Sequence, residues 1–375
     1  MNAPMRHLYV HVPFCPTICP YCDFHVVRRG RGLVERYLDR LEQEAASLHA
    51  SHPGPLDTLY VGGGTPSFLR DRELERLFAA LPWRLTAGAE VTLEVNPGTV
   101  NRARLELLAA LGVNRVSIGV QSFDAAMLRF LGRTHGPAAA LRTVEEALGL
   151  GLAVSLDLIL GLPGQNPRAE LETAAALGAG HVSAYTLQVE PGTPFALRGV
   201  STDPDAEAEA LALARRVLGA AGLSRYEVSN YAAAGAESRH NLAYWRMDSW
   251  GGLGPAAAAH FLTGDPARPS LRRLNPPLPR WLAGEDGRTE QIGPLAHARE
   301  ALMMGLRTRA GVDLAALEAR VGLDLRRPLA SAGLEELGVE LVGGRLRPDD
   351  AALDGLHRVI LRAWEALEAA YSGLS

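Results

Sequence analysis

Short apolar segments alternate with amphipathic ones through the first two hundred residues. Six stretches rich in Val, Leu, Ile and Tyr predict buried β-strands at 8–14, 58–62, 91–96, 115–121, 153–160 and 181–189. Between them, apolar residues recur at helical spacing in residues 33–49, 71–80, 101–111, 125–131 and 136–150. Because strands and helices alternate, the pattern predicts an α/β fold built on a parallel sheet.

Six strand-helix units suit a partial TIM-like (β/α)6 barrel better than a doubly wound sheet, although a Rossmann-like sheet has similar periodicity. Chemistry in such a barrel gathers where the strands end. Cys15, the glycines at 62–64, Glu94 and Gln121 lie at or just after predicted strand ends, and Asp157 lies within the fifth strand. This shared placement predicts a single site at one edge of the sheet.

The pattern changes after about residue 200. Residues 203–221 predict an alanine-rich helix, 225–231 a further strand, and 266–279, which contain five prolines, a linker or extended arm. From residue 293, helical segments with a turn at 342–346 predict a mostly helical, winged-helix-like domain. We therefore expect a core at 1–200, an extension with a linker at 201–290 and a C-terminal helical domain at 291–375.

Composition narrows the chemistry. The net charge of −4 gives no indication of nucleic-acid binding. All 38 basic residues are arginines. Without lysine, a P-loop lysine and a lysine Schiff base are excluded. We see no signal peptide, and the longest apolar stretch, 148–163, is too short to span a bilayer. We expect a cytoplasmic protein.

The three cysteines of the chain, Cys15, Cys19 and Cys22, lie within eight residues of one another. An odd number so close together indicates metal or redox chemistry rather than a disulfide framework. Thiolates suit both iron–sulfur clusters and zinc, and three of them would leave one iron of a cubane open to an outside ligand. Zinc is the alternative, with a fourth ligand from His11, Asp23 or His25. The chain has no distant second cysteine pair, which favours a cluster.

The C-x3-C-x2-C loop is accompanied by further motifs: GGGTP at 62–66, LEVNP at 93–97, SIGVQSF at 117–123, GRTH at 132–135, DLILGLP at 157–163 and HNLAYW at 240–245. Together they resemble the radical SAM superfamily. They are most similar to the branch that contains oxygen-independent coproporphyrinogen III oxidase and the HemW-type heme chaperones. The resemblance covers most of residues 8–265 and weakens in the last hundred.

The resemblance implies a 4Fe-4S cluster on Cys15, Cys19 and Cys22 and S-adenosylmethionine (SAM) on its open iron. Positions that match SAM-contacting or neighbouring residues of the family are Tyr9, Tyr21, Gly63, Gly64, Thr65, Glu94, Gln121, Arg133 and Asp157. Taken without the family, the glycines also fit an ordinary turn, the carboxylates a buried ion pair with an arginine, and the tyrosines core packing.

Two departures separate the relatives. The oxidase has a fourth cysteine two residues after the third, where this chain has Phe24, and a long N-terminal extension, where it has seven residues before its first predicted strand. Both favour the heme chaperone, with no catalytic residue assigned. The implied partners are heme and heme-acceptor proteins, including membrane-bound ones. His240 is the candidate heme ligand, with Tyr244 and Trp245 beside the porphyrin, although a structural histidine fits as well. A radical SAM oxidase and a zinc-stabilised ligand-binding barrel are the alternatives.

Overall fold

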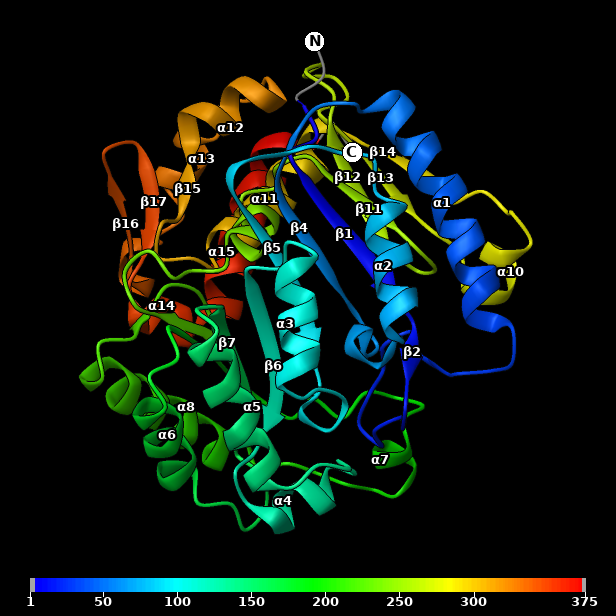
Figure 1. The fold of residues 1–375 in the computed structure, drawn as a ribbon. Coiled ribbons are helices and arrows are strands. Elements are labelled where there is room, and N and C mark those ends of the chain that lie inside the picture. Colours follow the sequence, from blue (N-terminus) through cyan, green and yellow to red (C-terminus); the bar gives the residue numbers. More distant parts are fainter. Residues whose placement is uncertain (1–3, 373–375) are drawn as a thin grey trace.

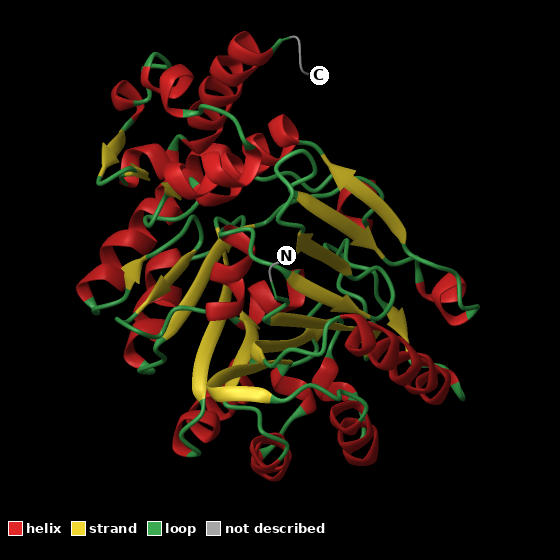
Figure 2. Ribbon diagram, turned by 90° about the horizontal axis from the view of Figure 1, so that it is seen from above, coloured by secondary structure: helices red, strands yellow, loops and turns green. Residues whose placement is uncertain are grey.

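A curved twelve-stranded sheet with helices along its outer side organises residues 4–372, which the computed structural model describes (Figures 1 and 2). Six neighbouring strands run parallel and follow one another in chain order: β1 (His7–Val12), β4 (Leu56–Gly63), β5 (Leu85–Val95), β6 (Arg115–Gln121), β7 (Ala153–Leu160) and β8 (His181–Thr186). The predicted α/β fold with a parallel sheet is confirmed. The hydrogen-bonded order is open, with β14 and β9 as its edges.

Each parallel strand is followed by helical structure that crosses back over the outer side. These helices are α1 (Leu33–Ser51), α2 (Asp71–Ala79), α3 (Arg102–Ala110), α4 (Ala125–Phe130), α5 (Pro137–Gly149), α6 (Pro167–Ala176) and α8 (Pro204–Ala220). Three short 3-10 helices, η1 (Pro66–Phe68), η2 (Pro97–Thr99) and η3 (Glu335–Leu337), lie in loops. The pattern of apolar residues predicted most of these helices, but α6 was missed because its sequence, PRAELETAAA, contains only one large apolar residue, Leu171.

Alternation along the strands gives the sheet a dry outer face and a polar inner face. In β5, Val91, Leu93 and Val95 belong to the main hydrophobic core beneath the helices. Successive side chains of a strand point to opposite sides, so Glu90 and Glu94 project to the inner face. Buried carboxylates need partners. The candidate functional side chains of the strands therefore lie on the inner face.

The sheet extends at both edges beyond the six predicted strands. Beside β1 lie β11 (Trp250–Leu253), which is parallel to it, and the antiparallel strands β12 (Ala258–Leu262), β13 (Ser270–Leu274) and β14 (Arg288–Ile292). Of the linker or extended arm predicted at 266–279, the structure has the extended form: the prolines flank β13, whose residues pair with β12 and β14 in the sheet. The predicted strand at 225–231 is a hairpin of β9 (Ser224–Arg225) and β10 (Asn230–Ala232).

The first predicted strand is broken by Pro13. Proline has no N–H to donate to a ladder, and β1 ends at Val12. Phe14–Cys15 forms a separate short strand, β2, which pairs in parallel with β3 (Val27–Arg28). The cysteine segment is the loop between these two strands. The last of the six parallel strands also ends earlier than predicted, at Thr186.

The C-terminal part has a hydrophobic core of its own. It contains α11 (Pro294–Gly305), α12 (Leu314–Val321), α13 (Arg326–Ala330), α14 (Asp350–Asp354) and α15 (Leu356–Tyr371), with a small sheet of β15 (Val312–Asp313), β17 (Arg345–Pro348) and β16 (Val339–Val342). The predicted turn is the hairpin between β16 and β17, where Gly343 and Gly344 adopt φ of 59° and 80°. Helices with a small β-wing confirm the winged-helix-like prediction. Among the described residues, no helix is long and apolar enough to cross a membrane.

Candidate functional site

A cavity opens at the carboxyl ends of β4 to β8, against the cysteine loop. Its walls are Cys15, Thr17, Ile18, Cys19, Tyr21, Cys22, Phe24, Val26, Gly63, Gly64, Thr65, Glu94, Val95, Asn96, Ser117, Gly119, Gln121, Arg133, Asp157 and Tyr185. The structure thus brings together all of the predicted cluster and SAM residues except Tyr9. The Tyr9 hydroxyl bonds the Nδ1 atom of His11 at 2.9 Å, and its ring lies against Tyr60, behind the cavity wall.

The three cysteines reach this cavity from a tight loop. Cys15 ends β2 and is buried, and the Cys22 N–H donates to the Cys19 carbonyl at 3.1 Å. Two cavity side chains donate to sulfur: Thr65 Oγ1 to Cys15 at 3.5 Å and Arg133 Nη1 to Cys19 at 3.6 Å. Burial raises the pKa of the Cys15 thiol and raises that of Cys22 to about 11. Metal binding at this loop must therefore release protons.

Two of the three residues suggested as a fourth zinc ligand, His11 and His25, are engaged elsewhere. His11 bonds Tyr9 through Nδ1 and the His25 carbonyl through Nε2, and His25 Nε2 accepts the N–H of Leu278 at 2.9 Å. Within residues 4–372, no three His, Cys, Asp or Glu side chains converge on the position of one ion. The histidine contacts tie the cysteine loop to β1 and to α10 (Leu278–Leu282).

Backbone crowding explains the glycines at the end of β4. Gly63 has φ of 108°, a conformation that side-chain-bearing residues rarely adopt. A Cβ atom on Gly64 would lie 2.9 Å from the Phe14 carbonyl oxygen. The glycine segment therefore packs directly on the strand that carries Cys15. This close approach goes beyond what an ordinary turn requires.

Two carboxylates occupy the inner wall of the cavity. Burial is the main reason that the pKa of Glu94 rises to about 7, against hydrogen bonds from Tyr60 and the Gly63 N–H that lower it. Burial likewise raises the pKa of Asp157 to about 6, although hydrogen bonds from Ser183 and Ser117 oppose the shift. Neither carboxylate forms an ion pair within 4 Å among the described side chains. Both can accept hydrogen bonds from a ligand or form an ion pair with a positively charged ligand group.

Gln121 and Arg133 complete the wall with strained or unsatisfied groups. Gln121 has φ of 66°, unusual for a residue other than glycine, and its Oε1 accepts the Tyr185 hydroxyl at 2.9 Å. Arg133 donates through Nη2 to the Gly119 carbonyl, while its buried Nε has no partner in the described part of the chain. Backbone strain and an orphaned donor are typical of a ligand site.

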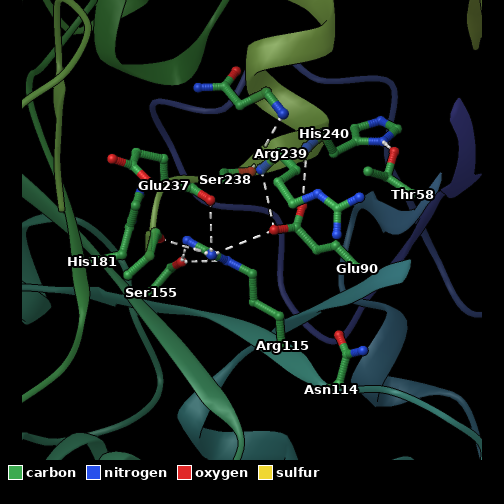
Figure 3. Close-up of polar contacts among 12 residues, drawn as sticks. Thr58, Glu90, Asn114, Arg115, Ser155, His181, Glu237, Ser238, Arg239 and His240 are labelled. Carbon is green, nitrogen blue, oxygen red and sulfur yellow. Dashed lines mark hydrogen bonds and ion pairs between the residues drawn. The ribbon is translucent and has the colours of Figure 1, made fainter. Parts of the chain in front are cut away.

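His240 lies at the opposite end of the inner face, in α9 (Arg239–Trp245). Figure 3 shows its ring against Thr58, whose hydroxyl lies 2.6 Å from Nδ1, and Nε2 is 2.8 Å from the Tyr244 hydroxyl. The side chain is buried, and burial lowers its pKa to about 3. In this arrangement both ring nitrogens are engaged, so ligation of heme iron would require the contact with Tyr244 to open.

The sequence reasoning missed the polar network that seats α9 (Figure 3). Glu90 accepts the N–H groups of Arg239 and His240 at 3.1 and 2.9 Å, and Arg115 donates to Ser155 and to the Ala236 carbonyl. Arg115 and Glu90 also form an ion pair at 3.5 Å. The sequence did contain a signal for Glu90 and Arg115: both are charged residues on the polar face of strands whose apolar and polar residues alternate.

Comparison with known proteins now adds to the geometry. The Radical SAM superfamily profile matches residues 9–177, and the HemN C-terminal domain profile matches residues 293–354. The heme chaperone HemW of Bacillus subtilis is 35% identical over 341 residues, which are 86% of this chain and 88% of that protein. The heme chaperone HemW of Escherichia coli is 40% identical over 269 residues, which are 68% of this chain and 70% of that protein.

A solved structure has the same fold over nearly the whole chain. Coproporphyrinogen III oxidase (HemN) from Escherichia coli, a radical SAM enzyme, superposes with a TM-score of 0.80, covering 97% of this chain and 90% of the other at 22% identity. The cysteine loop, the sheet and these matches define a radical SAM protein. Given the identity and coverage above, the chain belongs to the HemW family.

Proposed function

We propose that this chain is a heme-binding chaperone of the cytoplasm. In this proposal it holds a 4Fe-4S cluster and SAM and delivers heme to acceptor proteins, including membrane-bound ones. The observation that carries the proposal is the meeting, at one cavity, of three cysteine thiols with two carboxylates that have no cationic partner within ion-pair distance among the described residues. The heme part rests on the relatives, which are named heme chaperones.

The cysteine loop fits a cluster better than a zinc ion. Cys15, Cys19 and Cys22 would supply three thiolates, and the donors from Thr65 and Arg133 would stabilise the negative charge on sulfur. Two of the three side chains considered for a fourth zinc ligand already make structural hydrogen bonds. When bound, a reduced cluster of this kind supplies an electron to SAM.

The remaining walls fit SAM. Glu94 and Asp157 offer acceptors for its amino group or ribose hydroxyls, and Arg133 offers a cation for its carboxylate. The glycine segment leaves room for a ligand to approach backbone groups. A bound cation would also favour the ionised form of both carboxylates, which burial disfavours.

The heme site remains a prediction. His240 is still the proposed axial ligand, on the condition that the Tyr244 hydroxyl leaves Nε2. The domain limits of 1–200, 201–290 and 291–375 are likewise proposed. The separate hydrophobic core of the C-terminal helices and the profile match at 293–354 support the last of them.

A radical SAM oxidase is the second candidate, because the solved oxidase shares the fold. Phe24 argues against it: the side chain at the position of the oxidase's fourth cysteine is an exposed phenyl ring at the cavity wall. Anaerobic incubation with coproporphyrinogen III separates the two candidates, since protoporphyrinogen is expected from the oxidase alone.

The central experiment is a heme titration of anaerobically reconstituted protein, with and without SAM, after iron, sulfide and zinc have been measured. We expect iron and sulfide in equal amounts, a spectral change of the cluster on adding SAM, and saturable heme binding that an apo-acceptor can reverse. Zinc in place of iron, or a cluster whose spectrum ignores SAM, would overturn the cofactor proposal. Failure to bind heme would overturn the chaperone proposal alone.

A further inference from the structure

Tyr60 links the cavity to the deeper part of the inner face. Its hydroxyl donates to Glu94 Oε1 at 2.9 Å, and Glu94 Oε2 accepts the Gly63 N–H at 2.8 Å. The carboxylate is therefore held at both oxygens, one by a side chain from mid-strand β4 and the other by the glycine segment at the end of the same strand. Movement of Tyr60 would release one of the two.

Gly62 permits this arrangement. A Cβ atom at Gly62 would lie 2.7 Å from both Glu94 Oε1 and the Tyr60 ring. The hydroxyl of Tyr60 and the carboxylate of Glu94 therefore occupy space that any other residue at position 62 would fill. The first glycine of the run serves the Tyr60–Glu94 contact, whereas Gly64 serves the packing against β2.

His240 supports Tyr60 from below. The two rings stack with centroids 5.2 Å apart and an interplanar angle of 28°. The imidazole is fixed by Thr58 and Tyr244, and its own backbone N–H is held by Glu90. A continuous series of contacts thus runs from α9 through His240 and Tyr60 to Glu94. Figure 3 shows the α9 end of this series, with His240, Thr58 and Glu90.

We propose that Tyr60 and His240 are positioning residues for the SAM site, acting through Glu94. This inference rests on the proposed binding of SAM at the cavity. Its consequence is a coupling: a His240 ring drawn away to ligate heme iron would no longer support Tyr60. Heme and SAM would then weaken each other's binding by the same factor, because coupling between two sites is reciprocal.

The test compares three variants of the reconstituted protein: Tyr60→Phe, His240→Ala and the control Tyr226→Phe. Tyr226, like Tyr60, contacts a histidine: its hydroxyl lies 2.9 Å from His181 Nε2, and it has no hydrogen bond to Glu94. Loss of a hydrogen bond to a charged group predicts a rise of about tenfold in the Kd for SAM with Tyr60→Phe. We expect a similar rise with His240→Ala, unchanged Kd in the control, and full iron content in all three.

The pH profile separates positioning from a general loss of packing. The Tyr60 hydroxyl lowers the pKa of Glu94, so its removal raises that pKa further. The SAM affinity of Tyr60→Phe should therefore recover between pH 7 and pH 9 more steeply than that of the unaltered protein. A merely structural defect would weaken binding equally at every pH.

Each remaining outcome has a defined meaning. Unchanged SAM affinity in Tyr60→Phe and His240→Ala overturns the inference, and so does loss of the cluster in Tyr60→Phe, since the cysteine loop would then depend on Tyr60. If His240→Ala weakens heme binding while SAM affinity stays unchanged, His240 serves heme and the positioning role is wrong. Failure of the unaltered protein to bind SAM instead overturns the proposed function on which the inference rests.

Discussion

The two ends of the inner face use similar residues in opposite ways. At the α9 end, Arg115, Glu90 and His240 are buried, and each of them has hydrogen-bonding partners. At the cysteine end, Arg133 Nε has no partner among the described residues and Glu94 lacks a counter-charge. Buried polar groups are normally satisfied, but unpartnered buried atoms also occur at the α9 end, at His181 Nδ1 and Trp245 Nε1. The cysteine end differs in charge: a guanidinium N–H and a carboxylate without an oppositely charged partner among the described residues line its cavity, and this favours a charged ligand there.

The same contrast separates the effects expected of mutations. Changes at the cysteine end should mainly alter what the protein binds, with smaller effects on stability that arise from the titration of Glu94 and from backbone strain. Changes at the α9 end should mainly alter stability, and among them only a change at His240 should alter binding, of heme directly and of SAM through the contact with Tyr60.

Replacement of a cluster ligand should have the largest effect. In Cys15→Ser, Cys19→Ser or Cys22→Ser the loop keeps two thiols, and we expect loss of essentially all of the cluster absorbance and of the iron. The unfolding midpoint of the cluster-free protein should hardly change. Thr17→Ala, in the same loop, is the matched control and should retain iron. Full cluster content in any of the serine variants would show that the ligand assignment is wrong.

Removing Arg115 should be the strongest change at the other end. Arg115→Met leaves Glu90 buried without its ion pair, and we expect a loss of about 3 kcal/mol in the free energy of unfolding. Arg102→Met, which removes an exposed pair with Glu106, should cost less than about 0.5 kcal/mol. Denaturant titration of the cluster-free proteins measures both. If both variants lost the same free energy of unfolding, the Arg115 network would not be what stabilises this end of the sheet.

Local pattern predicts the parts of the chain whose conformation is indicated by their own residues. The six parallel strands follow apolar runs, and the cysteine loop is one contiguous segment. The network beneath α9 joins Glu90 to a backbone N–H 150 positions away, and no local pattern encodes that distance. β13 was missed for a related reason: its neighbours in the sheet, rather than its proline-flanked sequence, make it a strand.

The site shows the same division. Motif resemblance assembled the cavity residues but also included Tyr9, whose hydroxyl turns to His11. It gave His240 a heme role without indicating that Thr58 and Tyr244 engage both ring nitrogens. Tyr60 lies in none of the motifs, and Ser117, although it begins SIGVQSF, was given no role. They follow from the alternation that puts every second residue of β4 and β6 on the inner face.

The stability of the ligand-free protein should depend on pH through Glu94. Its folded pKa of about 7 lies above the ordinary value, so the folded state holds the proton more tightly than the unfolded state does. The folded protein therefore loses stability relative to the unfolded chain as pH rises from about 5 through 7. In Glu94→Gln this loss is absent, and the variant should be more stable than the unaltered protein by roughly 2 kcal/mol at pH 8.

The difference between the two proteins isolates Glu94 from other titrating groups. At pH 5 the carboxyl is protonated in the folded protein, and the unfolding free energies should nearly coincide. SAM affinity should show the opposite dependence, rising with pH in the unaltered protein and staying flat and low in Glu94→Gln. A stability difference that is the same at pH 5 and pH 8 would contradict the raised pKa.

The smallest expected effect compares two strained backbone positions at the cysteine edge of the sheet. Gln121 and Ala256 have φ of 66° and 56°, and glycine adopts such values without steric cost. Ala256→Gly should raise the free energy of unfolding by up to about 1 kcal/mol and leave SAM binding unchanged. Gln121→Gly should gain less, because the Tyr185 hydroxyl loses its acceptor, and should weaken SAM binding severalfold. If both variants bind SAM normally, the strain at Gln121 serves the turn after β6 and not the ligand.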